Sequence, residues 1–266
     1  TIDRSETLVQ DCQLSPEEII KKIAEGGVVG MGGATFPTQV KLSVPPGKKA
    51  EFLIINGVEC EPYLTSDHRL MLERGEELLV GARIIARALQ VNKIYIGIEK
   101  NKPDAIDHLE KLASGYPEIE IVPLKVQYPQ GGEKQLINAV TRREVPSGGL
   151  PIDVGGVVDN VGTALAVYEA VQNNKPLIER VVTVTGKGIK TPVNLLMRIG
   201  TPVKSLIEYC GGMPESTGKV INGGPMMGRA VSNLDSVITK GSSGILLIED
   251  KEAKRKEAGT CIKCAK

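Results

Sequence analysis

The stretch FLIINGVECEPYLTSDHR, residues 52–69, opens with a run of four apolar residues and then turns polar. Similar short runs recur in KIYIGI at 93–98 and in IEIVPLKV at 119–126. Between and after these runs lie segments with a helical pattern, at about 69–89, 103–112 and 132–141. Short β-rich runs separated by helices need crossover connections, so the pattern predicts an α/β fold with a mainly parallel sheet.

Two of the predicted strands are followed by loops rich in polar residues and glycine. In NGVECEP, Glu59 and Glu61 share one side of an extended segment and are candidates to bind ribose hydroxyls or a ring. In YPQGGEKQ, residues 128–135, the side chains of Tyr128 and Glu133 flank two glycines. Ligands of open α/β sheets usually bind beyond the carboxyl ends of the strands. The alternative interpretation is a pair of solvent-facing turns.

A glycine-rich segment, GVVGMGGATFPTQVKL at residues 27–42, precedes the first strand and is called the glycine loop below. Gly30-x-Gly32 resembles the first half of a dinucleotide-binding fingerprint, but the loop follows a predicted helix that starts at Ser15 and has Thr35 at the sixth position. We therefore expect its backbone amides to cup a phosphate or a flat ring, with Lys41 supplying a counter-charge. A structural turn is the alternative.

The second half of the chain has a different pattern. VVDNVGTALAVYEAV, residues 157–171, predicts a helix capped by Asn160, and the composition changes near residues 173–176. Short β-rich runs with glycine turns and one helix follow, which favour a compact α+β module such as a β-grasp. We expect a Rossmann-like α/β domain, a small β-grasp domain and a cysteine-containing tail. The expected ranges are 1–14 for an N-terminal segment, 15–177 for a ligand-binding domain, 178–249 for the β-grasp domain and 250–266 for a linker and truncated tail.

Composition excludes several functions. The chain of 266 residues has 33 basic and 32 acidic residues, a net charge of +1, and 3% aromatic residues, so nucleic acid is not an expected partner. No apolar run reaches the roughly 18 residues needed to span a membrane, and the N-terminus lacks a signal-peptide pattern. Two histidines leave little basis for hydrolytic catalysis. We expect a cytoplasmic protein without direct membrane insertion.

Five cysteines are too scattered for a disulfide framework, and only Cys261 and Cys264 form a motif. Their Cys-x-x-Cys spacing fits half a zinc site, a redox pair or the first half of a cluster-binding run. The chain starts with Thr1 and stops two residues after Cys264, so we expect a fragment that does not itself hold a cluster.

The glycine loop, NGVECEP, YPQGGEKQL and VVDNVGTA occur together in one order. In that order they resemble the flavin-binding fold in the flavoprotein subunit of respiratory complex I. The chain is still more similar to the C-subunit family of the Rnf electron-transport complex, in which that fold precedes a soluble-ligand-binding (SLBB) β-grasp domain and a ferredoxin-type domain. The cobalamin reductase of propanediol utilisation and the proline-reductase electron-transfer protein share this architecture.

The resemblance implies binding residues for FMN and NADH. The residues implied to bind FMN are Gly30, Gly32, Gly33, Ala34, Lys41, Asn56, Glu59, Tyr128, Gly131, Glu133, Asn160 and Thr163. Those implied to receive NADH are Phe36, Glu61, Glu133 and Lys134. Cys261 and Cys264 are implied metal ligands of a 4Fe–4S centre in the full-length protein. Val58, Gly132 and Asp159 depart from the complex I pattern, which has Asp, Glu and Asn at these positions.

The resemblance implies an FMN-dependent oxidoreductase of the NADH dehydrogenase type. NADH gives up two electrons as hydride whereas an iron–sulfur centre accepts one at a time, so a flavin is needed between them. No protein acid or base is required for hydride transfer, and no catalytic residue is assigned. The implied partners are the other subunits and ferredoxin-type centres of a membrane-bound electron-transport complex, on the inner face of the membrane. The alternatives are a non-catalytic adaptor with a degenerate flavin pocket and a reductase with a soluble acceptor.

Overall fold

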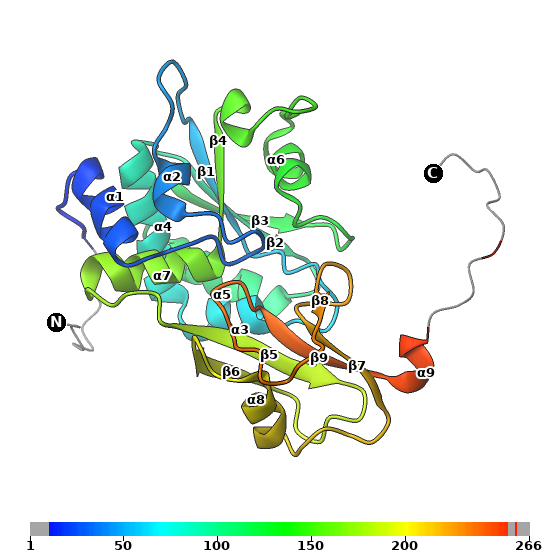
Figure 1. The fold of residues 1–266 in the computed structure, drawn as a ribbon. Coiled ribbons are helices and arrows are strands. Elements are labelled where there is room, and N and C mark those ends of the chain that lie inside the picture. The colour runs from blue at the N-terminus through cyan, green and yellow to red at the C-terminus, as the bar shows by residue number, and fades with distance from the viewer. Residues whose placement is uncertain (1–10, 255–258, 260–266) are drawn as a thin grey trace.

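The computed structural model describes residues 11–254 and residue 259, and it contains two sheets (Figure 1). The first is a four-stranded parallel sheet in the order β3-β2-β1-β4, and the second is a five-stranded mixed sheet. The fold class predicted from the sequence is confirmed. The strands of the parallel sheet are β1 (Phe52–Asn56), β2 (Ile94–Glu99), β3 (Ile119–Leu124) and β4 (Gly156–Asn160).

Helices cover both faces of the parallel sheet. Side chains alternate along β1, so Leu53 and Ile55 pack with the helices of one face, whereas Phe52 and Ile54 pack with α6 on the other. The first face carries α1 (Pro16–Glu25), α3 (Ser66–Glu73), α4 (Gly75–Leu89), α5 (Pro103–Ala113) and α7 (Val161–Gln172). The other face carries α6 (Glu133–Thr141) and the 3-10 helix η1 (Pro151–Val154).

The central helices α4 and α7 approach closely at Gly81. A Cβ atom at this position would lie 1.9 Å from the carbonyl oxygen of Ala164. Glycine therefore lets two helix backbones meet. The helix α7 begins at Val161, directly after β4 ends at Asn160.

Local sequence sets the helix starts that matter for the site. Ser15 caps α1 by accepting a hydrogen bond from the Glu18 amide, and the Glu18 carboxylate accepts one from the Ser15 amide. Asn160 caps α7, since its Oδ1 accepts a hydrogen bond of 2.8 Å from the Gly162 amide. Both helix starts were predicted from the sequence and are confirmed.

The structure corrects three local predictions. The segment predicted as one helix at 69–89 is two helices that meet at Arg74, where a φ of −131° and a ψ of 32° interrupt the helical backbone. Gly75 then starts α4 against Leu112, where a Cβ would lie 2.8 Å from that side chain. The glycine loop ends in a short helix, α2 (Thr38–Leu42). The residues before Asn160 form strand β4, which the sequence pattern did not separate from the helix that follows it.

The mixed sheet has the order β6-β5-β9-β7-β8 and packs on the helix α8 (Val203–Tyr209). Its core includes Val182 and Val184 from β5 and Leu206 and Ile207 from α8. The strands are β5 (Glu179–Gly186), β6 (Val193–Arg198), β7 (Thr217–Asn222), β8 (Arg229–Ala230) and β9 (Gly244–Glu249), and the short helix α9 (Asp250–Ala253) follows. The part of the chain that the structure describes contains no helix long and apolar enough to cross a membrane.

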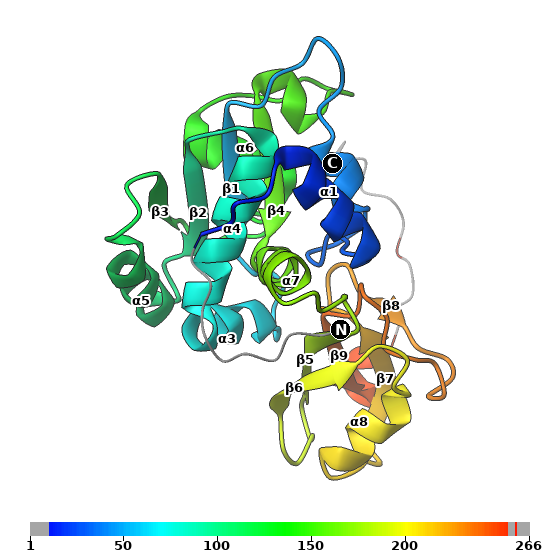
Figure 2. The ribbon, with the colours of Figure 1, turned by 90° about the vertical axis from the view of Figure 1, so that its left-hand side faces the viewer.

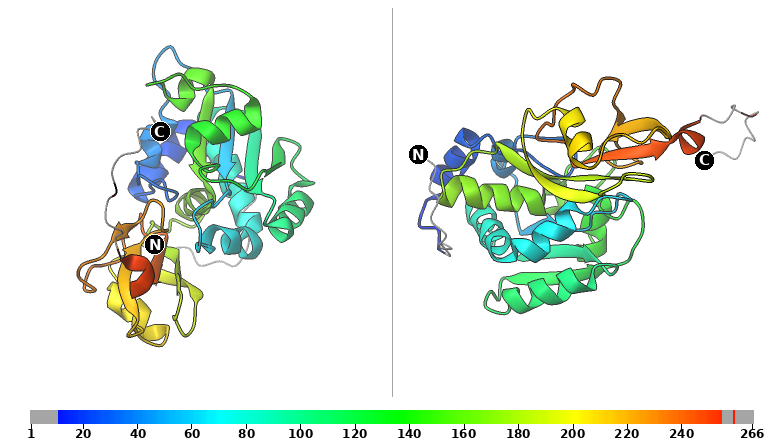
Figure 3. Two further views of the ribbon diagram at one scale, coloured as in Figure 1. Left: turned by 90° about the vertical axis from the view of Figure 1, so that its right-hand side faces the viewer. Right: turned by 90° about the horizontal axis from the view of Figure 1, so that it is seen from below.

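The mixed sheet lies against α7 and α3, beneath the helical layer of the parallel sheet (Figures 2 and 3). Thr65, just before α3, donates from its amide to Thr183 Oγ1 at 3.2 Å and exchanges hydrogen bonds with Asn194. The side chain of Lys240 reaches the Gly27 carbonyl. The loops that follow α1 and β1 are thus held partly by the mixed sheet.

Candidate functional site

The predicted binding loops meet at the carboxyl end of the parallel sheet. The register pairs Asn56 at the end of β1 with Asn160 at the end of β4, and Asn160 Nδ2 lies 3.4 Å from the Asn56 carbonyl. The loop after β3 reaches the same edge, because Asn56 Nδ2 donates to the Gly131 carbonyl at 2.9 Å. Asn56 Oδ1 accepts from the Val58 amide at 3.1 Å, so this one side chain ties together two of the loops.

The glycine loop folds back on itself above α7. The Gly30 amide donates to the Phe36 carbonyl at 2.8 Å, and the Met31 amide donates to Thr163 Oγ1 at 2.9 Å. Gly32 lies against Asn160, since a Cβ on Gly32 would be 3.1 Å from that side chain. A Cβ on Gly33 would meet nothing within 4 Å. The tip of the loop therefore borders open space beside the α7 N-terminus.

Lys41 connects the glycine loop to the other side of the sheet. Its Nζ donates to the Val158 carbonyl at 2.7 Å and forms an ion pair of 3.1 Å with Glu133, the first residue of α6. Asp159, at the end of β4, is 3% exposed. Burial and the charge of Glu133 raise the pKa of Asp159 to about 6, although Lys41 acts in the opposite direction.

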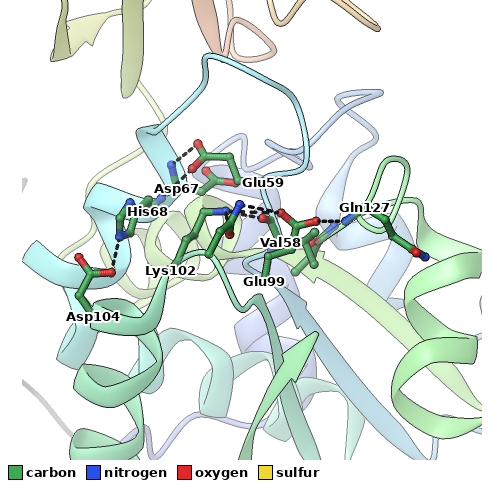
Figure 4. Close-up of polar contacts among 10 residues, drawn as sticks. Val58, Glu59, Asp67, His68, Glu99, Lys102, Asp104 and Gln127 are labelled. Atoms are coloured by element: carbon green, nitrogen blue, oxygen red, sulfur yellow. Dashed lines mark hydrogen bonds and ion pairs between the residues drawn. The ribbon is translucent and has the colours of Figure 1, made fainter. Parts of the chain in front are cut away.

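Glu59 has a left-handed backbone, with φ of 45°, and its carboxylate faces α3 (Figure 4). The carboxylate accepts hydrogen bonds from the amides of Asp67 at 2.8 Å and His68 at 3.1 Å, so it caps the helix from outside. Burial and the neighbouring Asp67 raise the pKa of Glu59 to about 7. The structure thus shows Glu59 as an anchor of α3, and its contact with a ligand stays a prediction.

A chain of buried polar groups joins the site to the mixed sheet. Asn160 Nδ2 donates to Asp67 Oδ2 at 2.7 Å. Burial raises the pKa of Asp67, and the positive charge of Arg180 on β5 acts to lower it. Arg180 is 4% exposed, and its guanidinium donates to the Lys240 carbonyl. Burial lowers the pKa of Arg180 to about 10, whereas Asp67 acts to raise it. The sequence analysis missed Asp67 and Arg180 because their roles depend on a contact between distant segments.

Lys102 is a second buried cation that the sequence analysis missed. It is 6% exposed, donates to the Val58 carbonyl at 2.8 Å and lies 3.9 Å from the Glu99 carboxylate (Figure 4). The other oxygen of Glu99 accepts from the Gln127 amide at 3.1 Å. Lys102 therefore holds the loop after β1 through Val58, and Glu99 holds the loop after β3 through Gln127.

The residues predicted to receive NADH do not form one cluster. Glu61 accepts hydrogen bonds from the amides of Met226 at 3.1 Å and Met227 at 2.7 Å, in the loop between β7 and β8. Phe36 is 49% exposed beside the glycine loop. Lys134 points away, with its Nζ 3.3 Å from the Pro146 carbonyl. Two of these four residues contact the predicted FMN set: Glu133 pairs with Lys41, and the Phe36 carbonyl accepts from the Gly30 amide.

The remaining predicted residues border the site or lie outside the described part. Tyr128 is 41% exposed on the loop that also carries Gly131, and Ala34 is exposed at the tip of the glycine loop. A cleft of about 730 Å³ lies between β3 and α6 and includes Lys134, but none of the predicted FMN residues. Cys261 and Cys264 lie outside the described residues. Among residues that are described, no three His, Cys, Asp or Glu side chains are placed to hold a metal ion.

Two family models match successive parts of the chain. The family model described as the Nuo51 FMN-binding domain matches residues 23–169, and the model of the SLBB domain matches residues 181–230. An NAD+-reducing NiFe hydrogenase in the H2-reduced state aligns with a TM-score of 0.70 at 21% identity, covering 89% of this chain and 47% of the hydrogenase chain. At that identity the likeness shows the fold alone.

Curated relatives are parts of ion-translocating redox complexes by name. The C subunit of the proton-translocating ferredoxin:NAD(+) oxidoreductase complex of Clostridium ljungdahlii is 52% identical over 96% of this chain and 55% of the relative. The Na(+)-translocating counterpart of Acetobacterium woodii is 47% identical over 95% of this chain and 57% of the relative. The C subunit of the ion-translocating oxidoreductase complex of Rhodobacter capsulatus is 47% identical over 95% and 49%. The chain thus spans about half the length of these relatives.

Proposed function

Because the chain belongs to the Nuo51 FMN-binding domain family, with an SLBB domain after it, we propose that it is an electron-transfer flavoprotein module. It exchanges electrons between NADH or NAD and iron–sulfur clusters through FMN. The names of the relatives, which pair ferredoxin with NAD(+), support the two ends of this reaction.

The observation that carries the proposal is the open backbone cradle of the glycine loop. Gly33 has no neighbour within 4 Å of a Cβ position, while Gly32 is held against Asn160 and Met31 is held by Thr163. Two buried side-chain atoms of the described residues lack hydrogen-bond partners: Thr38 Oγ1, at the end of the glycine loop where α2 starts, and Asp159 Oδ2, in β4 next to Asn160. A cradle without side chains next to unsatisfied polar atoms fits a flat, polar cofactor.

The residues present fit FMN. The cradle of Gly30, Gly32, Gly33 and Ala34 would lie along it, and Tyr128, Gly131 and Glu133 would border it from the loop after β3. Asn56, Asn160, Thr163 and Lys41 would line the site, and in this structure their polar groups are hydrogen-bonded within the protein. When bound, FMN supplies the step between a two-electron hydride donor and one-electron acceptors.

The side chains of this chain bind and orient, and none is asked to transfer a proton to substrate. Lys41 places a positive charge between the Val158 carbonyl and the Glu133 carboxylate, where it offsets the negative charge of Glu133. Asn56 and Asn160 hold the loops at fixed distances through hydrogen bonds to the backbone. Phe36 is exposed beside the glycine loop, whereas Glu61 is half-buried against the loop between β7 and β8. Both remain our candidates for NADH, with Glu133 and Lys134.

The same proposal extends to the rest of the protein. Residues 15–177 form the flavin domain, 178–249 the β-grasp domain, and 250–266 begin a ferredoxin-type domain in which Cys261 and Cys264 are the first ligands of a 4Fe–4S cluster. The partners are the other subunits of a membrane-bound complex, and the location is the cytoplasmic face of that membrane. The coarse class, a component of an oxidoreductase complex, is supported by the names of three relatives.

The test is to measure equilibrium binding of FMN and of riboflavin to the purified chain, with quenching of flavin fluorescence as the signal. We expect one FMN per chain, and weaker binding of riboflavin by about tenfold or more, because riboflavin lacks the phosphate that the cationic and amide groups would hold. Absence of FMN binding at any concentration up to a millimolar would contradict the proposal and favour the non-catalytic adaptor.

A further inference from the structure

Asp159 is a buried acid in the candidate site with an unused oxygen. It is the next-to-last residue of β4, is 3% exposed, and its Oδ2 has no hydrogen-bond partner among the described residues. Its neighbour Asn160 lies against Gly32 in the glycine loop. An unsatisfied carboxylate is costly to bury, and such groups often mark a functional site.

The charges around Asp159 do not balance. Lys41 from α2 and Glu133 from α6 are the charged groups whose fields act on it. Lys41 already forms an ion pair with Glu133 and a hydrogen bond to the Val158 carbonyl. Two carboxylates therefore share one ammonium group, which leaves one excess negative charge when all three groups are ionised. Burial raises the pKa of Asp159 to about 6, so the excess is removed by a proton within an accessible pH range.

Building on the proposed flavin site, we infer that Asp159 holds a proton for the site, binding it when the flavin is reduced and releasing it when the flavin is reoxidised. Added negative charge on the flavin makes a neutral acid at Asp159 more favourable, by the same electrostatic coupling that joins any two nearby titrating groups.

The step balances in atoms and electrons. NADH transfers hydride, a proton with two electrons, to the flavin and leaves as NAD+, so the flavin site gains one negative charge. The Asp159 carboxylate takes one proton from water and becomes the neutral acid. When two single electrons pass to iron–sulfur acceptors, the hydride proton and the Asp159 proton both return to water.

The experiment compares wild-type chain with Asp159→Asn, each loaded with FMN, by spectroelectrochemical titration from pH 5 to pH 8. At pH 8 and a given electrode potential, we expect the ratio of reduced to oxidised flavin to be at least about tenfold higher in the variant than in the wild type. This corresponds to a midpoint potential that is higher by about 30 mV for a two-electron couple. At pH 5 the two potentials should coincide, because Asp159 is then protonated in the wild type throughout. The exposed Asp107→Asn on α5 is the matched control and should follow the wild type.

A second measurement does not depend on the substitution. Infrared difference spectra of the wild type, oxidised minus reduced at pH 7, should contain the carbonyl band of a protonated carboxylic acid in the reduced state, and Asp159→Asn should lack it. Potentials that run parallel across the whole pH range, or a carboxylic acid band that persists in the variant, would overturn the inference. If the wild type binds no FMN, the proposed function fails instead, so the two failures are distinguishable.

Discussion

Gly33→Val is expected to lower the affinity for FMN at least about a hundredfold while leaving the free energy of unfolding unchanged. A Cβ on Gly33 meets no protein atom within 4 Å, and Gly33 does not have a left-handed backbone, so the described part of the chain accommodates valine. The same space is where we place the flavin, and the branched side chain would fill it. A hundredfold loss corresponds to about 2.8 kcal/mol of binding free energy.

The matched control for this prediction is Gly115→Val. Gly115 also has no neighbour within 4 Å of a Cβ position and no left-handed backbone, but it lies between α5 and β3, at the opposite end of the parallel sheet. Flavin fluorescence titration and urea unfolding should show both variants as stable as the wild type, with only Gly33→Val defective in binding. Unimpaired FMN binding by Gly33→Val would place the flavin elsewhere.

Arg180→Met is expected to destabilise the protein by about 3–5 kcal/mol, because it removes the cation from β5 and leaves Asp67 buried without it. Asp67 holds Asn160, the cap of α7, so a disturbed Asp67 also disturbs the flavin site. Methionine keeps the length and apolar character of the arginine stem, which limits the loss to charge and hydrogen bonds. Urea unfolding measures the effect.

A double variant tests whether Arg180 and Asp67 are coupled, and a surface variant serves as the control. Asp67→Asn combined with Arg180→Met should lose less than the sum of the single variants, because the neutral amide no longer needs the cation. Arg198→Met, at an exposed position on β6, should stay within about 0.5 kcal/mol of the wild type. Strict additivity of the Asp67 and Arg180 substitutions would show that the two side chains are not coupled.

The parts of the fold that were predictable are those encoded in continuous segments. The apolar runs at 52–55, 93–98 and 119–126 match β1, β2 and β3 to within two residues at each end. Asn160 caps α7 as expected. Short apolar runs and capping depend on neighbours in sequence, so both could be predicted. Strand β4 was missed because it is short and only Asp159 and Asn160 separate its two valines from the apolar helix α7.

The parts that were not predictable depend on long-range contacts. The expectation that Glu59 and Glu61 share one side of an extended segment was wrong, because the left-handed backbone of Glu59 breaks that segment and its carboxylate bonds α3 instead. The bonds of Glu61 to the amides of Met226 and Met227 exist only because the two sheets pack together. Lys102 and Arg180 read as surface cations, yet each is at most 6% exposed. Only the packed fold places them beside Glu99 and Asp67.

The measurement that tests the central claim most directly is an anaerobic titration of the FMN-loaded chain with NADH, followed by flavin absorbance. We expect the flavin band to bleach in proportion to added NADH, with an end point at about one NADH per FMN, because each hydride carries the two electrons that one flavin accepts. Bound FMN that remains oxidised after excess NADH, in a chain whose flavin is reducible by dithionite, would contradict the account.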